Sequence, residues 1–276
     1  MSDRYSLPEV DPDLVRRVHR ILDPICRHYF RGEVRGLERV PAEPTLVVGN
    51  HDGGVLPSDG IVLGWAWHER FAFLRPLRVL MHDFPLHLTQ RLNTFLHGVG
   101  VISASPHALE AALDGGQSVL VYPGAAHEAF RRWRERAVVD LAGRTGFVVR
   151  ALRRGLPITP VVSAGAHDTL FVLARGQAIA ERLGIKRHFR AEVWPLAIGL
   201  PWGLWWGPMW PYLPLPSKIT VEVLPPIDAR GILGRAPKPE DADDKELVDR
   251  VFAQVVERMN EGLRRLYGER RWPVIG

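Results

Sequence analysis

Residues 45–51 read Thr-Leu-Val-Val-Gly-Asn-His, a short apolar and β-branched run that ends in glycine and two polar side chains. A run of this kind, preceded by Pro44 and closed by Gly49, predicts a buried strand. Asn50 and His51 then follow the carboxyl end of that strand. Ligands of open α/β sheets bind beyond the carboxyl ends of the strands, so we expect a functional site here.

The rest of the chain alternates strand patterns with helix patterns. This alternation predicts an α/β fold with a mostly parallel central sheet flanked by helices. A chain of 276 residues can form one large α/β domain or two small ones, and we interpret residues 1–276 as a single domain. Strands are predicted over 45–49, 78–81, 99–103, 117–122, 158–163 and 218–224, and helices over 57–67, 143–155 and 243–267, with a further helix beginning near Pro106.

Composition limits the class of protein. Hydrophobic residues make up 46% and charged residues 24%, as in packed globular proteins. The net charge of +5 suits nucleic acid, an anionic membrane or a phosphate-bearing ligand, although charge alone favours a solvated basic face with no partner. The single cysteine, Cys26, fits a reducing compartment. We predict no metal site and no nucleic-acid partner, because clustered ligands and recognised binding motifs are missing from the sequence.

The first group of candidate catalytic residues follows the strand at 45–49. A neutral imidazole at His51 suits removal of a hydroxyl proton near pH 7, and it needs a carboxylate on its second nitrogen. Asp59, at the start of the next predicted helix, is one candidate for this role, and Asp52 is the other. The alternative interpretation makes His51 a capping or core residue and Asp59 a simple helix-start charge.

The second group follows the strand at 117–122 and reads Pro-Gly-Ala-Ala-His-Glu over 123–128, with two arginines after it. A strand that ends in Pro123 and Gly124 lets backbone amides approach a ligand closely. Glu128 is predicted to hold an acceptor hydroxyl or to organise the site. Arg131 and Arg132 are predicted to pair with a phosphate. A tight turn followed by a charged surface helix is the alternative.

Taken together, the two groups resemble the lysophospholipid acyltransferase superfamily, which includes glycerol-phosphate acyltransferases. The segment around Gly124 is similar to its diacylglycerol-acyltransferase-like branch, in which a Pro-Gly-Gly turn precedes a glutamate. Residues 98–103 match the middle block and residues 158–162 the last, so that the resemblance covers residues 40–225. It implies a glycerol-phosphate-acyltransferase-like fold.

The resemblance also implies roles for matching residues. His51 would deprotonate the acceptor hydroxyl for attack on a thioester, with Asp59 as its partner. Seven residues separate the two here, where the superfamily has four. Gly124 and Glu128 match the third block, and Asn50, Ala125, Arg131 and Arg132 are taken as substrate-binding. No metal or bound cofactor is implied, and the donor would be acyl-CoA or acyl carrier protein.

The middle block departs from the superfamily at its end. An arginine associated with an acceptor phosphate usually stands there, but this chain has Ala104 and Ser105. The departure favours a neutral acceptor, such as a diacylglycerol, a sugar lipid or a long-chain alcohol. We therefore predict an O-acyltransferase that acts peripherally at the cytoplasmic face of the cell membrane. The alternative is a catalytically inactive lipid-binding protein that retains the fold, and the oligomeric state is left open.

Two segments bear on membrane contact. Residues 13–31 form an amphipathic pattern that fits a helix packed on the core or, less favoured, one that also meets lipid headgroups. Residues 193–217 carry no formal charge but six prolines, which predict a loop or broken element instead of a transmembrane helix. Because tryptophan prefers the bilayer interface, we interpret this segment as an interfacial patch or a wall of the acyl tunnel, with a buried lid or a dimer contact as alternatives. Its five tryptophans are Trp194, Trp202, Trp205, Trp206 and Trp210.

Overall fold

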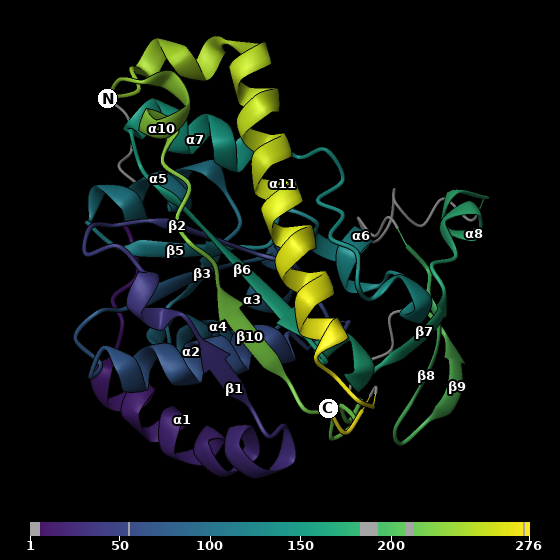
Figure 1. The fold of residues 1–276 in the computed structure, drawn as a ribbon. Helices are drawn as coiled ribbons and strands as arrows, with labels where there is room; N and C mark the ends of the chain where they lie inside the picture. The colour runs from purple at the N-terminus through teal and green to yellow at the C-terminus, as the bar shows by residue number, and fades with distance from the viewer. Residues whose placement is uncertain (1–5, 55, 183–192, 208–211, 273) are drawn as a thin grey trace.

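A seven-stranded sheet forms the centre of the computed structural model, which describes residues 6–54, 56–182, 193–207, 212–272 and 274–276 (Figure 1). Five adjacent strands run parallel to one another, and the two strands at one edge run the opposite way. The fold class predicted from the sequence is confirmed. In spatial order the strands are β1 (Glu33–Arg35), β10 (Thr220–Val223), β6 (Ile158–Ala164), β2 (Leu46–Gly49), β5 (Ser118–Val121), β3 (Leu77–Met81) and β4 (Val101–Ser103).

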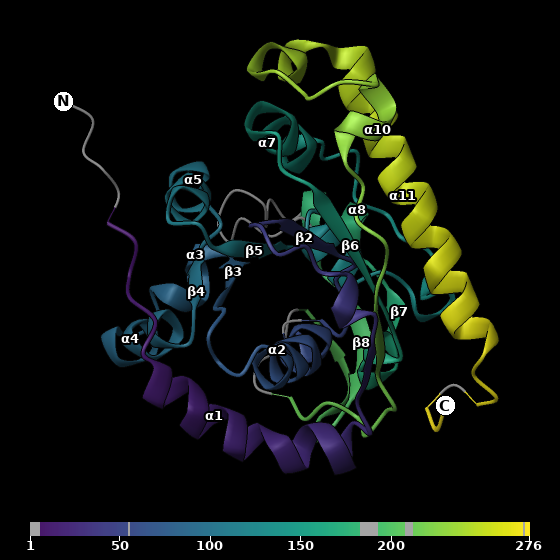
Figure 2. The same cartoon turned by 60° about the vertical axis from the view of Figure 1, so that its left-hand side comes forward.

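Helices cover both faces of this sheet (Figure 2). Leu46 and Val48 point into one apolar cluster with residues of α5 (Pro106–Asp114), α7 (Gly146–Arg154) and α11 (Lys245–Gly268). Val47 points the other way, into a cluster with α2 (Ser58–Arg70) and the segment that follows α1 (Pro12–Pro24). A strand buried on both faces reads as a continuous apolar run, which is the pattern of residues 45–49.

The N-terminal helical segment is divided into two parts. It was predicted over 13–31, and α1 ends at Pro24, after which Ile25–Tyr29 form a π-helix. Shorter helices complete the part of the chain that the structure describes: α3 (Asp83–Leu86), α4 (Gln90–Gly98), α6 (Ala125–Ala129), α8 (Gln177–Arg182) and α10 (Ala229–Leu233), with 3₁₀ turns at 37–39, 133–135, 166–169 and 239–243.

A second, antiparallel sheet stands beside the main one at the side of α6 and α8 (Figure 1). Its strands are β7 (Phe171–Ala174), β8 (Leu196–Gly199) and β9 (Gly203–Trp206). The segment predicted as a loop or broken element thus forms a β-hairpin in its first half. Trp210 lies outside the described residues. Among the described residues, no helix combines the length and the hydropathy that crossing a bilayer requires.

Candidate active site

The two predicted groups meet because their strands are neighbours. β2 and β5 pair in parallel, with Val48 opposite Val121, so the residues that follow each strand emerge at the same edge of the sheet. His51 and Tyr122 are in direct contact there: their rings are stacked with centroids 4.7 Å apart and planes 30° apart. The structure therefore brings His51 next to the Pro123–Gly124 turn, as the sequence predicts.

Asp59 is the carboxylate that faces the imidazole. It lies in the first turn of α2, is almost fully buried, and its Oδ2 is 4.0 Å from His51 Nδ1. This separation is longer than a hydrogen bond. However, His51 Nδ1 is buried without another hydrogen-bond partner, and so are both Asp59 carboxylate oxygens. Catalytic hydrogen bonds often tighten only when substrate binds, and these two groups are placed to close on each other.

Asp52 has other partners. One of its carboxylate oxygens pairs with Arg131, and the other accepts a hydrogen bond from Asn50 Nδ2 at 2.8 Å. Asn50 also uses its amide to tie the ends of β2 and β6 together: Oδ1 accepts from the Ser163 backbone N–H at 2.8 Å. Asn50 was predicted to bind substrate, but its buried amide lies within this internal network.

Burial sets the charge state of His51. It lowers the pKa of His51 to about 4, and the positive charge of Arg131 acts in the same direction. Burial also raises the pKa of Asp59 well above its usual range, with the nearby Asp52 adding to the effect. His51 is therefore neutral near pH 7, which a base must be before it accepts a proton.

Glu128 holds in place the segment from His51 to Asp59, the candidate catalytic loop. Its fully buried carboxylate accepts the His51 backbone N–H at 2.9 Å on one oxygen and the Asp140 backbone N–H at 3.2 Å on the other. Burial raises the pKa of Glu128 to about 8, against the opposing charge of Arg131. Of the two roles predicted for Glu128, this geometry matches organisation of the site, because both oxygens are occupied by backbone donors.

The two arginines have opposite environments. Arg131 is fully buried, pairs with Asp52, and donates to the backbone carbonyl oxygens of His51 at 3.0 Å and Glu128 at 3.1 Å. Its predicted pairing with a ligand phosphate is contradicted by this burial, because Asp52 already occupies the guanidinium. Arg132 is exposed, and its backbone N–H donates to Glu135 Oε2 at 3.3 Å.

The turn after β5 is tightly constrained. A Cβ on Gly124 would lie 2.5 Å from Glu128 Cβ and from Oε2, so only glycine leaves room for the glutamate. Ala125 has φ of +45°, a left-handed conformation that a β-carbon disfavours. The similar acyltransferase branch has its second glycine at this place. Gly124 and Ala125 therefore contribute to the site through the backbone conformation of the turn.

Tyr122 is a residue whose role the sequence reasoning missed. Its ring lies over the backbone of β2 and α2: a Cβ on Gly49 would come within 2.6 Å of Tyr122 Cε1, and one on Gly60 within 3.0 Å of the Tyr122 hydroxyl. The hydroxyl also faces Asp59, where it acts to lower the pKa of that carboxyl. The glycines at 49 and 60 were the available signal, since each makes room for this ring.

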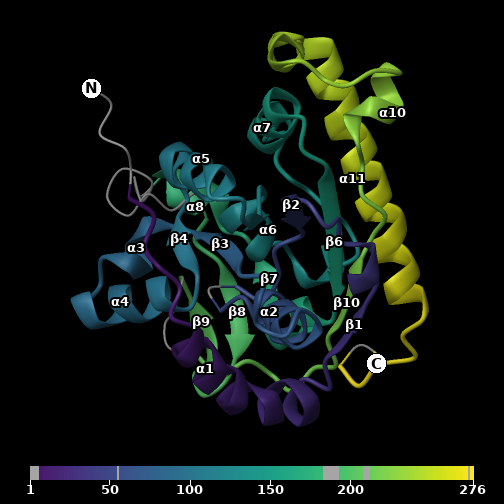
Figure 3. The same ribbon diagram turned by 90° about the vertical axis from the view of Figure 1, so that its left-hand side faces the viewer.

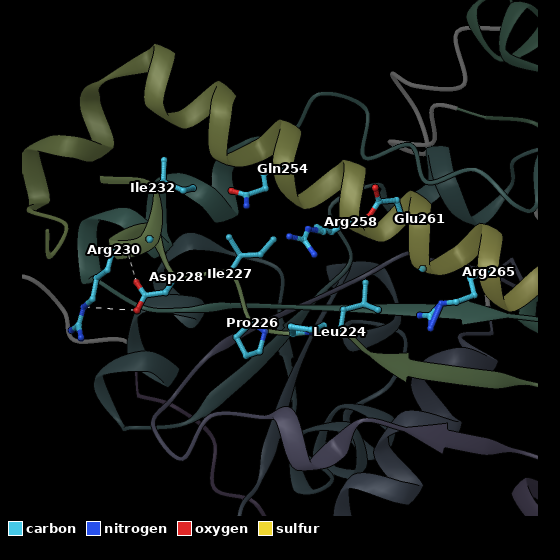
Figure 4. Close-up of a pocket in the computed structure, with 13 residues that line it drawn as sticks. Leu224, Pro226, Ile227, Asp228, Arg230, Ile232, Gln254, Arg258, Glu261 and Arg265 are labelled. Atoms are coloured by element: carbon cyan, nitrogen blue, oxygen red, sulfur yellow. Dashed lines mark hydrogen bonds and ion pairs between the residues drawn. The ribbon is translucent and has the colours of Figure 1, made fainter. Parts of the chain in front are cut away.

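A large open pocket lies elsewhere (Figure 4). Its volume is about 730 Å³, and it is lined by the 224–232 segment and by Gln254, Arg258 and Arg265 of α11. Leu224 follows β10, which runs antiparallel to β6, so the pocket lies toward the amino end of β6 and away from His51. In the described part of the chain, no group of three or more His, Cys, Asp or Glu side chains is placed to hold a metal ion.

Together, the parallel sheet, the histidine after its central strand and the glycine turn after the neighbouring strand define the class of lipid acyltransferases. The model of the diacylglycerol acyltransferase family matches residues 12–267, and the chain belongs to that family. The protein is an acyltransferase.

Relatives and a solved structure extend this assignment. An uncharacterized protein of Mycobacterium tuberculosis is 30% identical over 275 residues, which are 98% of this chain and 72% of that protein. The human 2-acylglycerol O-acyltransferase 3 is 27% identical over 216 residues, 73% of this chain and 60% of the human protein. The 1-acyl-sn-glycerophosphate acyltransferase PlsC of Thermotoga maritima shares the fold, with a TM-score of 0.51 and 15% identity over 95% of this chain and 79% of its own.

Proposed function

We propose that the protein transfers a fatty acyl group from an acyl thioester to the hydroxyl of a neutral lipid, with His51 as the general base. The observation that carries the proposal is the approach of two buried groups, His51 Nδ1 and Asp59 Oδ2, to 4.0 Å from each other beside the glycine turn. A neutral imidazole oriented by a carboxylate is the arrangement that removes a proton from an attacking hydroxyl.

The reaction would proceed by direct transfer. Because Nδ1 faces Asp59, His51 Nε2 is the ring nitrogen left for substrate, and it takes the proton as the acceptor oxygen attacks the thioester carbonyl carbon. The C–O bond forms, the C–S bond breaks, and the leaving thiolate receives the proton back from Nε2. Asp59 stabilises the imidazolium between these steps. Glu128 and Arg131 keep the His51 backbone in position through its N–H and its C=O.

A neutral acceptor follows from where the cations are. At the end of the middle block, Ser103 Oγ donates to Asp83 and Ser105 caps α5, and Arg131 is engaged with Asp52. None of the described residues Ser103, Ser105 and Arg131 therefore provides a free positive charge for a lipid phosphate near His51. The name of the human relative, 2-acylglycerol O-acyltransferase, agrees with an uncharged acceptor of the acylglycerol class. We also propose that the enzyme works peripherally on the cytoplasmic face of the membrane with acyl-CoA or acyl carrier protein as donor.

The test is an acyl-transfer assay with labelled acyl-CoA and with acyl carrier protein against micellar diacylglycerol, monoacylglycerol, long-chain alcohol and lysophosphatidate. We expect acylation of a neutral acceptor and a loss of at least about a hundredfold in His51→Ala, the lower end for removal of a general base. His107→Ala, an exposed histidine on α5, is the matched control. Equal rates in the wild type and His51→Ala would refute the role of His51, and exclusive use of lysophosphatidate would refute the neutral acceptor.

A further inference from the structure

The three-stranded sheet has apolar side chains on the side that faces solvent, where an antiparallel sheet usually has polar ones. Here β7, β8 and β9 contain no charged or polar side chain at all: they read Phe-Val-Leu-Ala, Leu-Ala-Ile-Gly and Gly-Leu-Trp-Trp. Four of their large apolar residues are between 42% and 62% exposed: Leu173, Ile198, Leu204 and Trp206.

The register shows that most of this exposure belongs to one face. Val172, Ala197 and Trp205 lie opposite one another across the three strands and are all buried. The neighbouring row, Phe171, Ile198 and Leu204, alternates with them and therefore points outward. We call the outward-pointing residues Phe171, Leu173, Leu196, Ile198, Leu204 and Trp206 the outer sheet face. Exposed apolar patches of this kind mark interaction surfaces.

The opposite face of the same sheet covers the catalytic loop. Its buried residues pack with Phe130 and Tyr212 in one apolar cluster. The Tyr212 hydroxyl donates a hydrogen bond to the Gly53 backbone carbonyl oxygen, and it accepts one from the Leu56 backbone N–H at 3.0 Å. The residues between His51 and Asp59 are thus braced by the inner side of this sheet. A surface bound by the outer sheet face would therefore be separated from the catalytic loop only by the thickness of this sheet.

Basic side chains border the outer sheet face along β7. Trp133 packs against Phe171 with ring centroids 5.5 Å apart, which fixes the 133–135 turn at this border. Arg132 and Arg134, on either side of Trp133, are exposed, and within the described residues neither guanidinium has an ion-pair partner. A charge-free apolar surface with tryptophan on it and free arginines at its border complements the acyl and headgroup layers of an anionic bilayer.

We propose that the outer sheet face is the membrane-docking surface of the protein and that Arg132 and Arg134 contact anionic headgroups around it. The inference goes beyond the proposed acyl transfer, because binding to a bilayer is measured without turnover. Docking through this face would hold the catalytic loop at the membrane surface, where a neutral lipid acceptor resides. It also accounts for a sheet that would otherwise expose its apolar side chains to water.

Sedimentation with vesicles of phosphatidylcholine, with and without phosphatidylglycerol, tests the proposal. The variant Leu204→Glu/Trp206→Glu places two charges on the outer sheet face at exposed positions of the edge strand, and we expect partitioning to fall at least about tenfold. Leu74→Glu, at an apolar and still more exposed position in the turn after α2, is the control and should bind normally. Arg132→Gln/Arg134→Gln should lose about fivefold per arginine, only with phosphatidylglycerol and only at low salt.

Two further measurements distinguish a loss of membrane binding from a loss of folding or of acyl transfer. Thermal unfolding verifies that each variant is folded, and acyl transfer to a short-chain, water-soluble acceptor should be unchanged in Leu204→Glu/Trp206→Glu. Normal vesicle binding by that variant would overturn the proposal. A wild-type dimer that this variant dissociates would also overturn it, because a second copy of the chain would then cover the face. Loss of all transfer in His51→Ala with normal vesicle binding would leave the two proposals distinct.

Discussion

The catalytic loop and the three-stranded sheet depart from the usual rules of burial in opposite ways. At the loop, Asp52, Asp59, Glu128 and Arg131 are charged residues with at most 2% of their surface exposed. At the outer sheet face, large apolar residues are exposed and charged residues are absent from the strands. Proteins depart from local rules mainly at functional sites. Under the two proposals, the contrast is a division of labour: buried charge shapes the chemistry, and exposed apolar surface carries the contact with lipid.

The largest effect is expected where a buried charge would lose its partner. Arg131→Ala leaves Asp52 buried without its cation and frees the His51 carbonyl, and we expect the free energy of unfolding to fall by about 3–5 kcal/mol. Arg132→Ala, one residue further and exposed, should change it by less than about 0.5 kcal/mol. Chemical denaturation of both variants measures the difference. Similar small losses in both would show that the buried network is not what holds the loop.

The second effect concerns the chemistry alone. Asp59→Asn keeps the size of the side chain but removes the negative charge that faces His51 Nδ1, and we expect kcat to fall about a hundredfold with little change in KM. The free energy of unfolding should not decrease, because the burial that raises the pKa of Asp59 disfavours its charged form. A full kinetic comparison with Asp52→Asn separates the two candidates. If Asp52→Asn lost kcat at normal stability and Asp59→Asn did not, Asp52 would be the partner.

The pH dependence of the rate below pH 7 provides a third test, which concerns the burial of His51. A base works while it is neutral, which is the case above its pKa. Burial lowers the pKa of His51 to about 4, so His51 should stay neutral as the pH falls from 7 to 5, whereas protonation of Asp59, whose pKa burial raises, would lower activity by itself. An imidazole with an ordinary pKa near 6.5 would lose about thirtyfold at pH 5. The pH dependence of kcat/KM with the soluble acceptor in Asp59→Asn, where His51 is the titrating member of the pair, measures this, and an apparent pKa near 6.5 would contradict the buried environment.

A fourth prediction concerns the Tyr122 ring, which stacks on His51 and whose hydroxyl faces Asp59. Gly49→Ala would place a Cβ 2.6 Å from Tyr122 Cε1, so the ring must shift away from its stack on His51. Overpacking of this kind costs about 1–2 kcal/mol of stability, and we expect activity to fall with it. Gly64→Ala, in the interior of α2 with open space at the Cβ position, should stabilise by up to about 1 kcal/mol. Equal stability of the two variants would show that the ring is not confined.

The sequence predicts the main sheet well and the appended sheet poorly, for physical reasons. Strands such as 158–163 are buried on both faces, so their apolar β-branched runs are distinctive, and the structure has β6 at Ile158–Ala164. Residues 193–217 carry six prolines and apolar side chains on both sides of each strand, so neither the breaker pattern nor the alternation indicated a hairpin. In that segment the apolar outer face hides the period of two that normally reveals a strand.

The same limit applies to the candidate site. His51, Asp59 and the Gly124 turn were found because they follow strands in sequence and the strands proved to be neighbours. Arg131 was misjudged because arginine is mostly exposed, and only tertiary structure shows that Asp52, 79 residues away, neutralises it. Tyr122 was quoted within the motif without a role, since its contacts with Gly49 and Gly60 depend on how β2, β5 and α2 pack.

The smallest effect is expected at the turn itself, where backbone shape replaces side-chain chemistry. Ala125 has φ of +45°, which costs an L-residue about 1–2 kcal/mol and costs glycine almost nothing. Part of this gain is offset because glycine is more flexible in the unfolded chain, so Ala125→Gly should stabilise by about 0.5 kcal/mol. Ala126→Gly, in the ordinary helical conformation of α6, should instead destabilise by about 0.5–1 kcal/mol. Denaturation midpoints that move in opposite directions for these adjacent positions would show that the turn before Glu128 requires a left-handed residue, and midpoints that fall together would show that it does not.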